Sequence, residues 1–487
     1  MSQDMRQADR RPVSDRPTAS ARRLGHLAAV LPRGEAIRNF VYTGALDEVA
    51  KQADLTVLSV APSEEIWGAL ASRYPRVLPL RQLPERWTIG ALRDILDMAH
   101  GRWLWSEAAQ ERWRLRDREA TTAAARAKRL AMKLACYPFA SRTGLGVLSR
   151  VERTASRWLR TTDEYVRLFQ ELGVSFLFNG SHVHGKIAIQ AVQAAQWLKI
   201  PTATFIFSWD NLTSQGRVTP PYDYYLVWSK AIREQLLQIY PTVDPERVFV
   251  TGTPQFDFHF RPEYHWTREE FCERMGADPS RPILFYATGM ANHMPDEPAI
   301  VESIADMAQE MDDLGRPQLL VRVYPKDQTG RFEELKRRRP DILFPPVAWE
   351  PAWLTPRVED TPVLTNTLRH AAVGINVAST VSLELCMFDK PVVNIGYNPP
   401  GLPEEELSYA RYYKFDHYRP VVESGAVQVA SSPAELRTLV RQALLHPQER
   451  SAQRRALIER LFGNTLDGCS GHRVARVLCQ LMEAEGS

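Results

Sequence analysis

The sequence has no apolar run long enough to cross a membrane, which excludes a membrane-spanning protein at once. No stretch of about 18 apolar residues occurs, so we expect no transmembrane helix. The amino terminus is polar and rich in arginine, and it lacks the apolar segment of a secretory signal. These absences predict a cytoplasmic protein, with the inner face of the membrane included as a location.

Cysteine is scarce, and the cysteines that occur are far apart. The chain has five, with no CxxC spacing between any two of them. This pattern disfavours a zinc site or a disulfide framework and fits a reducing compartment. No group of His, Cys, Asp and Glu has metal-ligand spacing, and no DxD-type motif lies in a plausible loop. The sequence therefore predicts no metal and no cofactor.

The chain also lacks two signatures of nucleotide and nucleic-acid binding. Its formal net charge of +3 is small for 487 residues and disfavours a dedicated nucleic-acid binder. The first strand leads into the loop 32–35, which lacks the GxGxxG fingerprint, so we expect no tightly bound dinucleotide.

What the sequence does contain is a repeated alternation of strands and helices. Apolar strands are predicted at 26–31 and 55–60, with a helical pattern over 37–52 between them, and the alternation continues to the carboxyl terminus. Such alternation predicts an open α/β sheet, and the length predicts more than one domain. The boundaries that we predict are a disordered tail 1–23, a first domain 24–262, a second domain 263–465 and a final helical segment 466–487.

A helical and basic region near 91–160 interrupts the first domain. Arginines and lysines crowd residues 107–133, and Trp103, Trp105 and Trp113 lie beside or within this run. The region can be a solvated helix face, which is the usual fate of a run of charge. Alternatively it docks on anionic lipid or on a lipid-linked diphosphate acceptor, as basic helices that carry tryptophan do.

The stretch 372–398 organises the second domain. It is predicted to form a buried strand, a turn at 378–380, a short helix and a second buried strand. Ser379 and Thr380 are good helix N-caps, and a helix N-terminus can hold a phosphate. Glu384 lies about one helical turn further on and could accept hydrogen bonds from a ribose. The alternative is an ordinary βαβ unit with a capped helix.

Other polar groups follow strands of the same domain. Thr288 and Gly289 form a turn after the strand 283–287, and Arg322 and Lys326 end the strand 319–323. With no metal to neutralise a phosphate, basic side chains and helix N-termini would do so. Arg322 can instead form a structural salt bridge, and both interpretations are open.

Five motifs carry a resemblance to a known family. They are SWDNLTSQG (208–216), VTGTPQFD (250–257), VRVYPKD (321–327), ASTVSLE (378–384) and KPVVN (390–394). With two α/β domains they resemble the GT-B glycosyltransferases, and most closely the bacterial surface-polysaccharide and CDP-glycerol glycerophosphotransferase-like branch. That branch usually has an acidic residue and tandem serines where this chain has 376–380, Asn-Val-Ala-Ser-Thr, which favours a nucleotide sugar as donor.

The resemblance implies a fold and a reaction. The expected fold has two Rossmann-like domains facing a central cleft, with a helical insertion in the first and the final helix returning to pack on the first domain. The expected reaction moves a sugar from a nucleotide-sugar donor to a cell-surface polysaccharide or lipid-linked acceptor, without a metal. The family implies a base in the first domain, for which the candidates are His182, His184 and Asp210.

The same resemblance groups the candidate donor-binding residues. They are Gly252, Thr253, Thr288, Gly289, Arg322, Lys326, Ser379, Thr380 and Glu384. His417 is a further loop histidine at the expected cleft, and Trp209 can stack on a sugar or pack in the core.

Three other functions stay open at this stage. A CDP-glycerol-type polyol-phosphate transferase and a UDP-sugar 2-epimerase share the fold and the phosphate-binding logic. A non-catalytic carbohydrate- or lipid-binding protein could use the fold without turnover, because fold alone does not prove activity.

Overall fold

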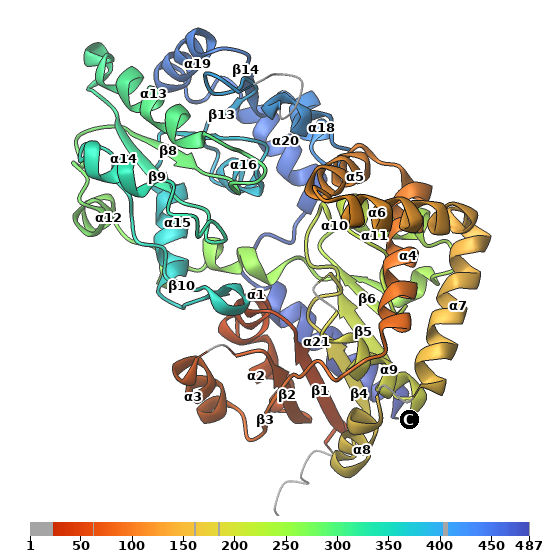
Figure 1. Cartoon of the computed structure of the whole chain (residues 1–487). Coiled ribbons are helices and arrows are strands. Elements are labelled where there is room, and N and C mark those ends of the chain that lie inside the picture. Colours follow the sequence, from red (N-terminus) through yellow and green to blue (C-terminus); the bar gives the residue numbers. More distant parts are fainter. Residues whose placement is uncertain (1–22, 62, 160–161, 184–185, 403–407, 487) are drawn as a thin grey trace, which may run out of the picture.

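The computed structural model describes residues 23–61, 63–159, 162–183, 186–402 and 408–486. Two α/β domains face each other, and each has a parallel sheet with helices packed on it (Figure 1). The predicted fold class is confirmed. The predicted tail 1–23 lies outside the described residues except for Arg23.

The first domain contains a seven-stranded parallel sheet. Its central strands are buried on both faces, which explains their continuous apolar sequences. In spatial order the strands are β3 (Val77–Pro79), β2 (Asp54–Ser59), β1 (His26–Leu31), β4 (Phe176–Asn179), β5 (Thr202–Phe205), β6 (Tyr224–Val227) and β7 (Val248–Val250). Its helices are α1 (Gly34–Ile37), α2 (Ala45–Ala50), α3 (Glu64–Arg73), α8 (Asp163–Leu172), α9 (Ile189–Trp197), α10 (Asn211–Ser214) and α11 (Lys230–Ile239).

The second domain contains a five-stranded parallel sheet and a small antiparallel pair, β10 with β11. The strands of the sheet are β14 (Gln428–Ala430), β13 (Val392–Ile395), β12 (Val373–Asn376), β8 (Ile283–Ala287) and β9 (Gln318–Arg322), and the pair is β10 (Trp349–Glu350) with β11 (Thr355–Pro356). Its helices are α12 (Arg268–Met275), α13 (Glu297–Gln309), α14 (Glu333–Arg338), α15 (Asp360–His370), α16 (Thr380–Met387), α18 (Arg419–Glu423), α19 (Pro433–Leu445) and α20 (Ser451–Phe462).

Local sequence explains where several helices begin. Ser229 caps α11 by accepting a hydrogen bond from the Ile232 amide, and Ser432 caps α19 by accepting one from Glu435. A predicted single helix over 37–52 is wrong, because Gly44 takes a left-handed φ of 82°. The chain there forms α1, a π-helical turn η1 (Arg38–Tyr42) and then α2.

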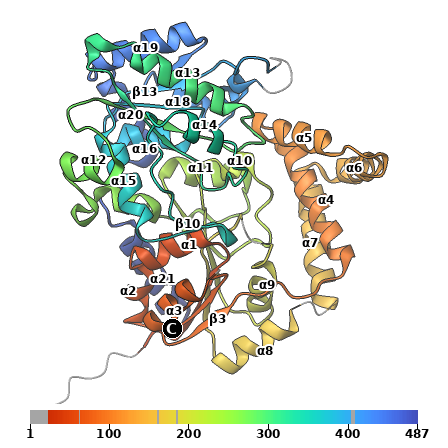
Figure 2. The ribbon, with the colours of Figure 1, turned by 60° about the vertical axis from the view of Figure 1, so that its left-hand side comes forward.

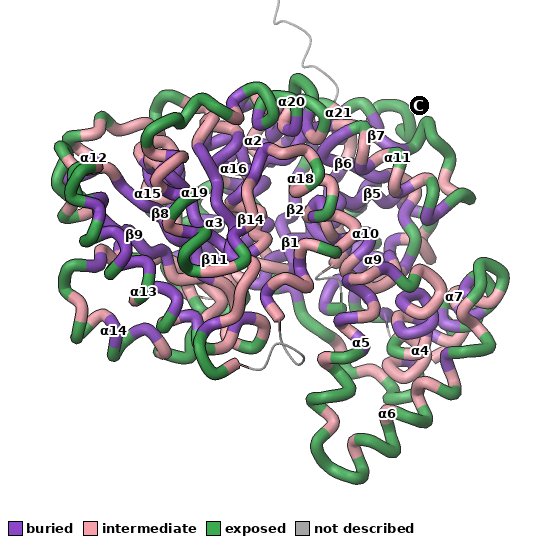
Figure 3. Tube along the Cα trace, turned by 90° about the horizontal axis from the view of Figure 1, so that it is seen from above, coloured by how far each residue is buried: buried purple, intermediate pink, exposed green. Residues whose placement is uncertain are grey.

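The basic region of the first domain is an inserted group of helices (Figure 2). They are α4 (Trp87–Leu104), α5 (Glu107–Glu119), α6 (Ala123–Cys136) and α7 (Arg142–Trp158). A small core of their own, which includes Leu96, Trp113 and Leu148, holds them together. Seen from above in Figure 3, α6 stands out from the body with a mostly exposed surface.

The last helix, α21 (Ser470–Glu485), packs against α2 of the first domain. Its N-terminus is held by Asp257, whose carboxylate accepts hydrogen bonds from the Ser470 amide (2.9 Å) and the Gly471 amide (2.7 Å). A carboxylate at this position accepts hydrogen bonds from amides that the helix leaves unpaired. Its negative charge also interacts favourably with the positive end of the helix dipole.

None of the helices in the described ranges is both long enough and apolar enough to cross a bilayer.

A buried histidine in the insertion predicts an acid-sensitive fold. His100 of α4 is fully buried against Tyr240, and burial lowers its pKa to about 3. Unfolding restores a pKa of about 6.5, so between these two values the unfolded chain binds the proton and the folded chain does not. Stability is therefore lost as pH falls below about 6.5, by about 1.4 kcal/mol per pH unit from this group.

We expect His100→Phe to reduce that slope while the parent keeps it. Urea denaturation at several pH values between 7.5 and 4.5 measures it. Equal slopes in the two proteins would show that His100 is not the source. Burial also lowers the pKa of His182. The His100→Phe variant therefore retains part of the acid sensitivity.

Candidate functional site

The cleft between the domains contains two neighbouring pockets, which we name after one residue in each. The Arg322 pocket has a volume of about 360 Å³, and the Asp210 pocket one of about 370 Å³. Ala378 lines both, in the turn after β12. Its φ of 41° is left-handed, a conformation that costs a non-glycine residue about 1 kcal/mol. Such strain clusters at functional sites.

The Arg322 pocket brings together most of the predicted donor residues. Its walls come from the turns after β8, β9 and β12 and from the start of α16. The predicted residues that line it are Thr288, Gly289, Arg322, Ser379, Thr380 and Glu384. They converge because parallel strands end at the same edge of their sheet.

The stretch 372–398 folds as the strand–turn–helix–strand unit that its sequence predicts. Ser379 caps α16, and its hydroxyl accepts a hydrogen bond from the Val381 amide at 3.2 Å. Thr380 accepts one from the indole of Trp209 at 3.1 Å. Trp209 is buried, so it ties the first domain to this helix and does not offer an open face to a sugar.

The turn at Thr288 and Gly289 is occupied by a carboxylate of the protein itself. The Gly289 amide donates to both oxygens of Glu297 at 3.0 Å, and Arg331 donates to the same carboxylate at 2.7 Å. Burial raises the pKa of Glu297 to about 7, despite the neighbouring Arg331. The Gly289 amide already donates its hydrogen bond to Glu297 and is not available to a phosphate. Gly289 therefore contributes only to the pocket wall.

Arg322 forms the salt bridge that was the alternative to phosphate binding. Its Nη2 lies 2.6 Å from Asp360, a residue of α15 that also accepts a hydrogen bond from Trp349. Its Nη1 is buried, and no described group accepts a hydrogen bond from it. One nitrogen of the guanidinium is thus anchored, and another is buried without a described partner, in a residue that lines the pocket.

Glu384 is held by a residue that the sequence did not single out. His259 Nε2 lies 3.0 Å from the Glu384 carboxylate, and His259 Nδ1 lies 3.0 Å from Thr365. His259 belongs to the 3₁₀ helix η4 (Pro254–Phe260), which follows VTGTP in the chain. The pair links the first domain to the start of α16 and fixes the direction of the carboxylate.

Charges from the first domain close the same cleft. Lys326 Nζ lies 3.6 Å from Glu35, in the short helix α1 that follows β1. Arg38 of η1 is desolvated beside Glu35 and Glu384, and its pKa is lowered by burial. Lys326 does not line the Arg322 pocket and instead bridges the domains. Ligands of α/β sheets lie at the loop after the first strand, and this position was the signal that could have identified Glu35 and Arg38.

Gly252 and Thr253 line neither pocket, and their assignment to donor binding stays a prediction. Gly252 has a φ of 78°, and a Cβ there would come within 3.0 Å of Thr465 and Arg473 and within 2.5 Å of Ser470. The glycine is needed where the chain passes close to the start of α21.

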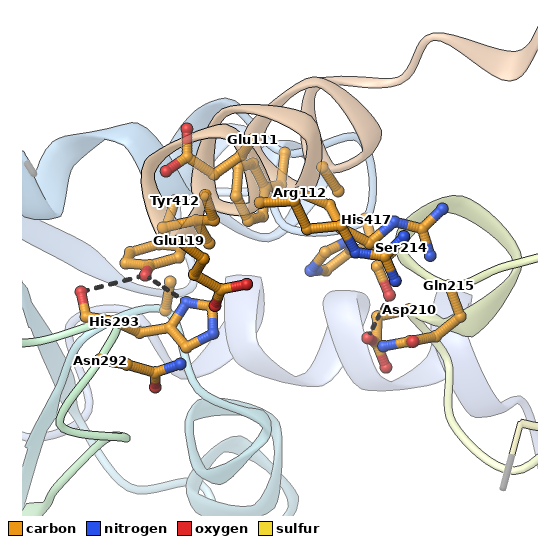
Figure 4. Close-up of a pocket in the computed structure, with 15 residues that line it drawn as sticks. Glu111, Arg112, Glu119, Asp210, Ser214, Gln215, Asn292, His293, Tyr412 and His417 are labelled. Carbon is orange, nitrogen blue, oxygen red and sulfur yellow. Dashed lines mark hydrogen bonds between the residues drawn. The ribbon is translucent and has the colours of Figure 1, made fainter. Parts of the chain in front are cut away.

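The Asp210 pocket is built by three parts of the chain (Figure 4). Helix α5 supplies Glu111, Arg112 and Glu119, the turn before α10 supplies Asp210, and loops of the second domain complete it. The Asp210 carboxylate accepts a hydrogen bond from Ser214 at 2.7 Å.

Two histidines of the second domain complete this pocket. Burial lowers the pKa of both His293 and His417. The ring of His417 stands edge-to-face on Trp209 with centroids 5.2 Å apart, and its Nδ1 is buried without a described partner. Both rings are therefore neutral near pH 7, beside a carboxylate.

Of the other candidate bases, His182 does not line this pocket. His182 is buried, lines neither pocket, and lies with Nδ1 3.3 Å from the Phe205 carbonyl. Burial lowers its pKa to about 4, so the ring is neutral near pH 7, and its role as base stays a prediction. His184 lies outside the described residues. Asp210 is the candidate base that the structure brings to a cavity.

Among the described residues, no three His, Cys, Asp or Glu side chains come together in a way that could hold a metal ion.

Comparison with known proteins finds likeness in structure only. No family model and no curated protein matches the sequence. A Listeria monocytogenes protein assigned to the UDP-N-acetylglucosamine 2-epimerases superposes with a TM-score of 0.55 and 12% identity, over 95% of this chain and 98% of that one. The Neisseria meningitidis UDP-GlcNAc 2-epimerase, solved with UDP-GlcNAc bound, gives 0.52 and 11% identity, over 94% and 100%.

The Methanocaldococcus jannaschii UDP-GlcNAc 2-epimerase gives a TM-score of 0.50 at 12% identity, over 93% of this chain and 99% of that one. At these identities the likeness establishes the fold. The chain has the GT-B-like architecture of two Rossmann-like domains around a cleft. The finer resemblance to the CDP-glycerol branch receives no support from these matches.

Because the ion pair of Arg322 and Asp360 is buried, we expect a single substitution to reduce the free energy of unfolding more than a double substitution does. Arg322→Ala leaves Asp360 buried without its counter-charge, so we expect a loss of about 3–5 kcal/mol in the free energy of unfolding. Arg322→Ala with Asp360→Ala removes both charges, so we expect a smaller loss than in the single variant. Urea denaturation measures both. A double variant that is less stable than Arg322→Ala would contradict this account.

Proposed function

We propose that the protein is a metal-independent glycosyltransferase that takes its sugar from a nucleotide-sugar donor. One observation carries this proposal: the Arg322 pocket and the Asp210 pocket adjoin at Ala378. The first gathers groups suited to a nucleoside diphosphate, and the second gathers a carboxylate and neutral histidines. A transfer reaction needs two substrates side by side, and two adjoining pockets meet that need.

The donor would occupy the Arg322 pocket. The unpaired Nη1 of Arg322 and the N-terminus of α16 would stabilise the negative charge that develops on the departing diphosphate. Glu384, oriented by His259, would accept hydrogen bonds from the ribose. Anchoring through Asp360 keeps the guanidinium in place before the donor arrives, so little reorganisation is needed.

The acceptor would enter the Asp210 pocket. In an inverting transfer its hydroxyl oxygen forms a bond to the anomeric carbon while the bond from that carbon to the diphosphate breaks. The hydroxyl proton goes to the Asp210 carboxylate, whose direction the Ser214 hydroxyl fixes. A polysaccharide or a lipid-linked saccharide is the acceptor class that we propose.

A UDP-sugar 2-epimerase is the second candidate. Its support is the whole-length likeness in fold to enzymes of that activity, one of them holding UDP-GlcNAc. Asp210, His293 and His417 in one pocket would supply groups that exchange a proton with a sugar carbon. This reaction needs no acceptor, which separates the two candidates by experiment.

The test has two arms. Thermal unfolding in the presence of UDP, CDP, GDP, CMP and dTDP sugars identifies the donor, because a ligand that binds the folded state raises the melting temperature. The donor is then incubated alone and with lipid-linked or polysaccharide acceptors, and the products are separated by chromatography. Transfer to an acceptor supports the proposal, whereas a 2-epimer formed without acceptor establishes the second candidate.

Asp210→Asn should separate chemistry from binding. We expect turnover to fall about 10²–10⁴-fold, because a positioned base contributes that much, while the nucleotide affinity stays the same. Asp244→Asn, an exposed aspartate far along the chain, serves as the matched control. Normal turnover in Asp210→Asn would remove Asp210 from the mechanism.

We also expect full activity in the presence of EDTA. The proposed stabilisation of the diphosphate uses Arg322 and the N-terminus of α16 and no divalent ion. Assays with EDTA, and then with added Mg²⁺ or Mn²⁺, check this. Loss of turnover in EDTA that either ion restores would overturn it.

A further inference from the structure

Large apolar side chains are exposed in an unusual concentration on the inserted helices. Trp87 at the start of α4 is 82% exposed and Trp158 at the end of α7 is 80% exposed. Leu130, Leu134, Tyr137, Val147 and Val151 are also exposed. Large apolar side chains are normally buried, because their burial stabilises the fold. A group of them on the surface therefore indicates an interaction site.

On α7 these side chains form a continuous stripe. Val147, Val151, Thr154 and Trp158 follow one another at helical spacing, and all are exposed. The opposite face of α7, with Leu145 and Leu148, packs into the small core of the insertion. A shallow groove of about 670 Å³ runs along the stripe.

Helix α6 repeats the pattern. Ala127, Leu130, Ala131 and Leu134 are exposed on one side, while Cys136 and Met132 face the core of the insertion. The apolar residues are therefore not needed to hold α6 in place. We call the exposed side chains of α6 and α7 the outer face.

The two tryptophans lie at the same end of the insertion. Arg93 of α4 donates to Glu152 and Ser156 of α7, and Arg142 at the start of α7 lies over the ring of Trp103 near the end of α4. The two helices therefore run antiparallel. The first residue of α4 and the last residue of α7, both tryptophan, therefore lie at the same end of this helix pair.

The charges that α6 and α7 themselves carry are almost all positive. Between residues 123 and 158 the only acidic residue is Glu152, which is buried and bonded to Arg93. The cations of this stretch are Arg126, Lys128, Arg129, Lys133, Arg142, Arg150, Arg153 and Arg157. Asp117 pairs with Arg129 and Lys133, and no described acid pairs with Arg150, Arg153 or Arg157. An apolar surface ringed by cations matches an anionic lipid surface.

A second copy of the chain fits this face poorly. Symmetric pairing of two outer faces would bring arginines against arginines, because an isologous interface places the same patch on both partners. A bilayer with anionic headgroups supplies apolar depth for tryptophan and leucine and opposite charge for the arginines.

We propose that the outer face of α6 and α7 docks on an anionic lipid bilayer. The same insertion carries α5, whose residues line the Asp210 pocket, so docking would hold that pocket next to the membrane surface (Figure 2). This inference rests on the proposed function only in one respect, the idea that a lipid-linked acceptor would then reach the pocket from the bilayer. The docking itself is argued only from the exposed apolar and basic side chains of α6 and α7.

Vesicle sedimentation with the full chain tests the proposal. We expect binding to phosphatidylcholine vesicles that contain about a third of phosphatidylglycerol, weak binding to phosphatidylcholine alone, and release as salt rises toward about 0.5 M. Leu134→Ser with Trp158→Ser should lower partitioning about tenfold or more, because it removes apolar groups from the bilayer. Arg150→Glu, Arg153→Glu and Arg157→Glu together should lower it about 100-fold.

The matched control replaces the same residue types elsewhere. Leu445→Ser with Trp353→Ser changes a leucine that is 55% exposed and a tryptophan that is 48% exposed, both outside the insertion. This control should bind vesicles like the parent. Circular dichroism and thermal unfolding check that each variant is folded, which the exposure of every changed residue favours.

Several outcomes would overturn the proposal. They are a parent that stays in the supernatant, outer-face variants that bind as the parent does, or a parent that is dimeric in light scattering until the outer face is changed. Nucleotide affinity in solution is measured alongside. Vesicle binding without nucleotide binding refutes the proposed function alone, and nucleotide binding without vesicle binding refutes the docking alone.

Discussion

Buried charge at the domain interface is the constraint on which the rest of the structure depends. Arg322 and Asp360 are buried in the second domain, and Glu384 faces His259 of the first across the cleft. A charge taken out of water is costly unless a partner meets it, so the pair of His259 with Glu384 favours arrangements of the two domains that keep these side chains in contact. The pairing of Lys326 with Glu35 adds a further contact of the same kind. The cleft is therefore specified by electrostatics as well as by packing.

That constraint also decides which groups are free to meet a ligand. The Gly289 amide donates a hydrogen bond to Glu297, and the Thr380 hydroxyl accepts one from Trp209. Arg322 retains a buried nitrogen without a partner, at the wall of a pocket. A polar group left unpaired in the interior costs free energy, and such groups persist where a ligand or water completes them. The strained turn at Ala378 lies at the same place, between the two pockets.

The insertion joins the site to the surface. Its inner helix α5 lines the Asp210 pocket, and Arg411 of the second domain pairs with Glu111 of α5 at 3.0 Å. Its outer helices expose apolar and basic side chains that the fold does not need. One small core holds the inner and outer helices of the insertion together.

The sequence by itself determined the fold class and most of the Arg322 pocket. Strands such as His26–Leu31 and Ile283–Ala287 match their predicted limits, because a strand buried on both faces is continuously apolar. The turns after such strands share one sheet edge, so Arg322, Ser379 and Glu384 could be grouped from order alone. Only the tertiary structure decided which donors were already used, that His182 is enclosed, that Gly252 lies close to the start of α21, and that His259 and Glu35 pair with Glu384 and Lys326. Those facts depend on contacts between residues far apart in the chain, which local sequence patterns do not encode.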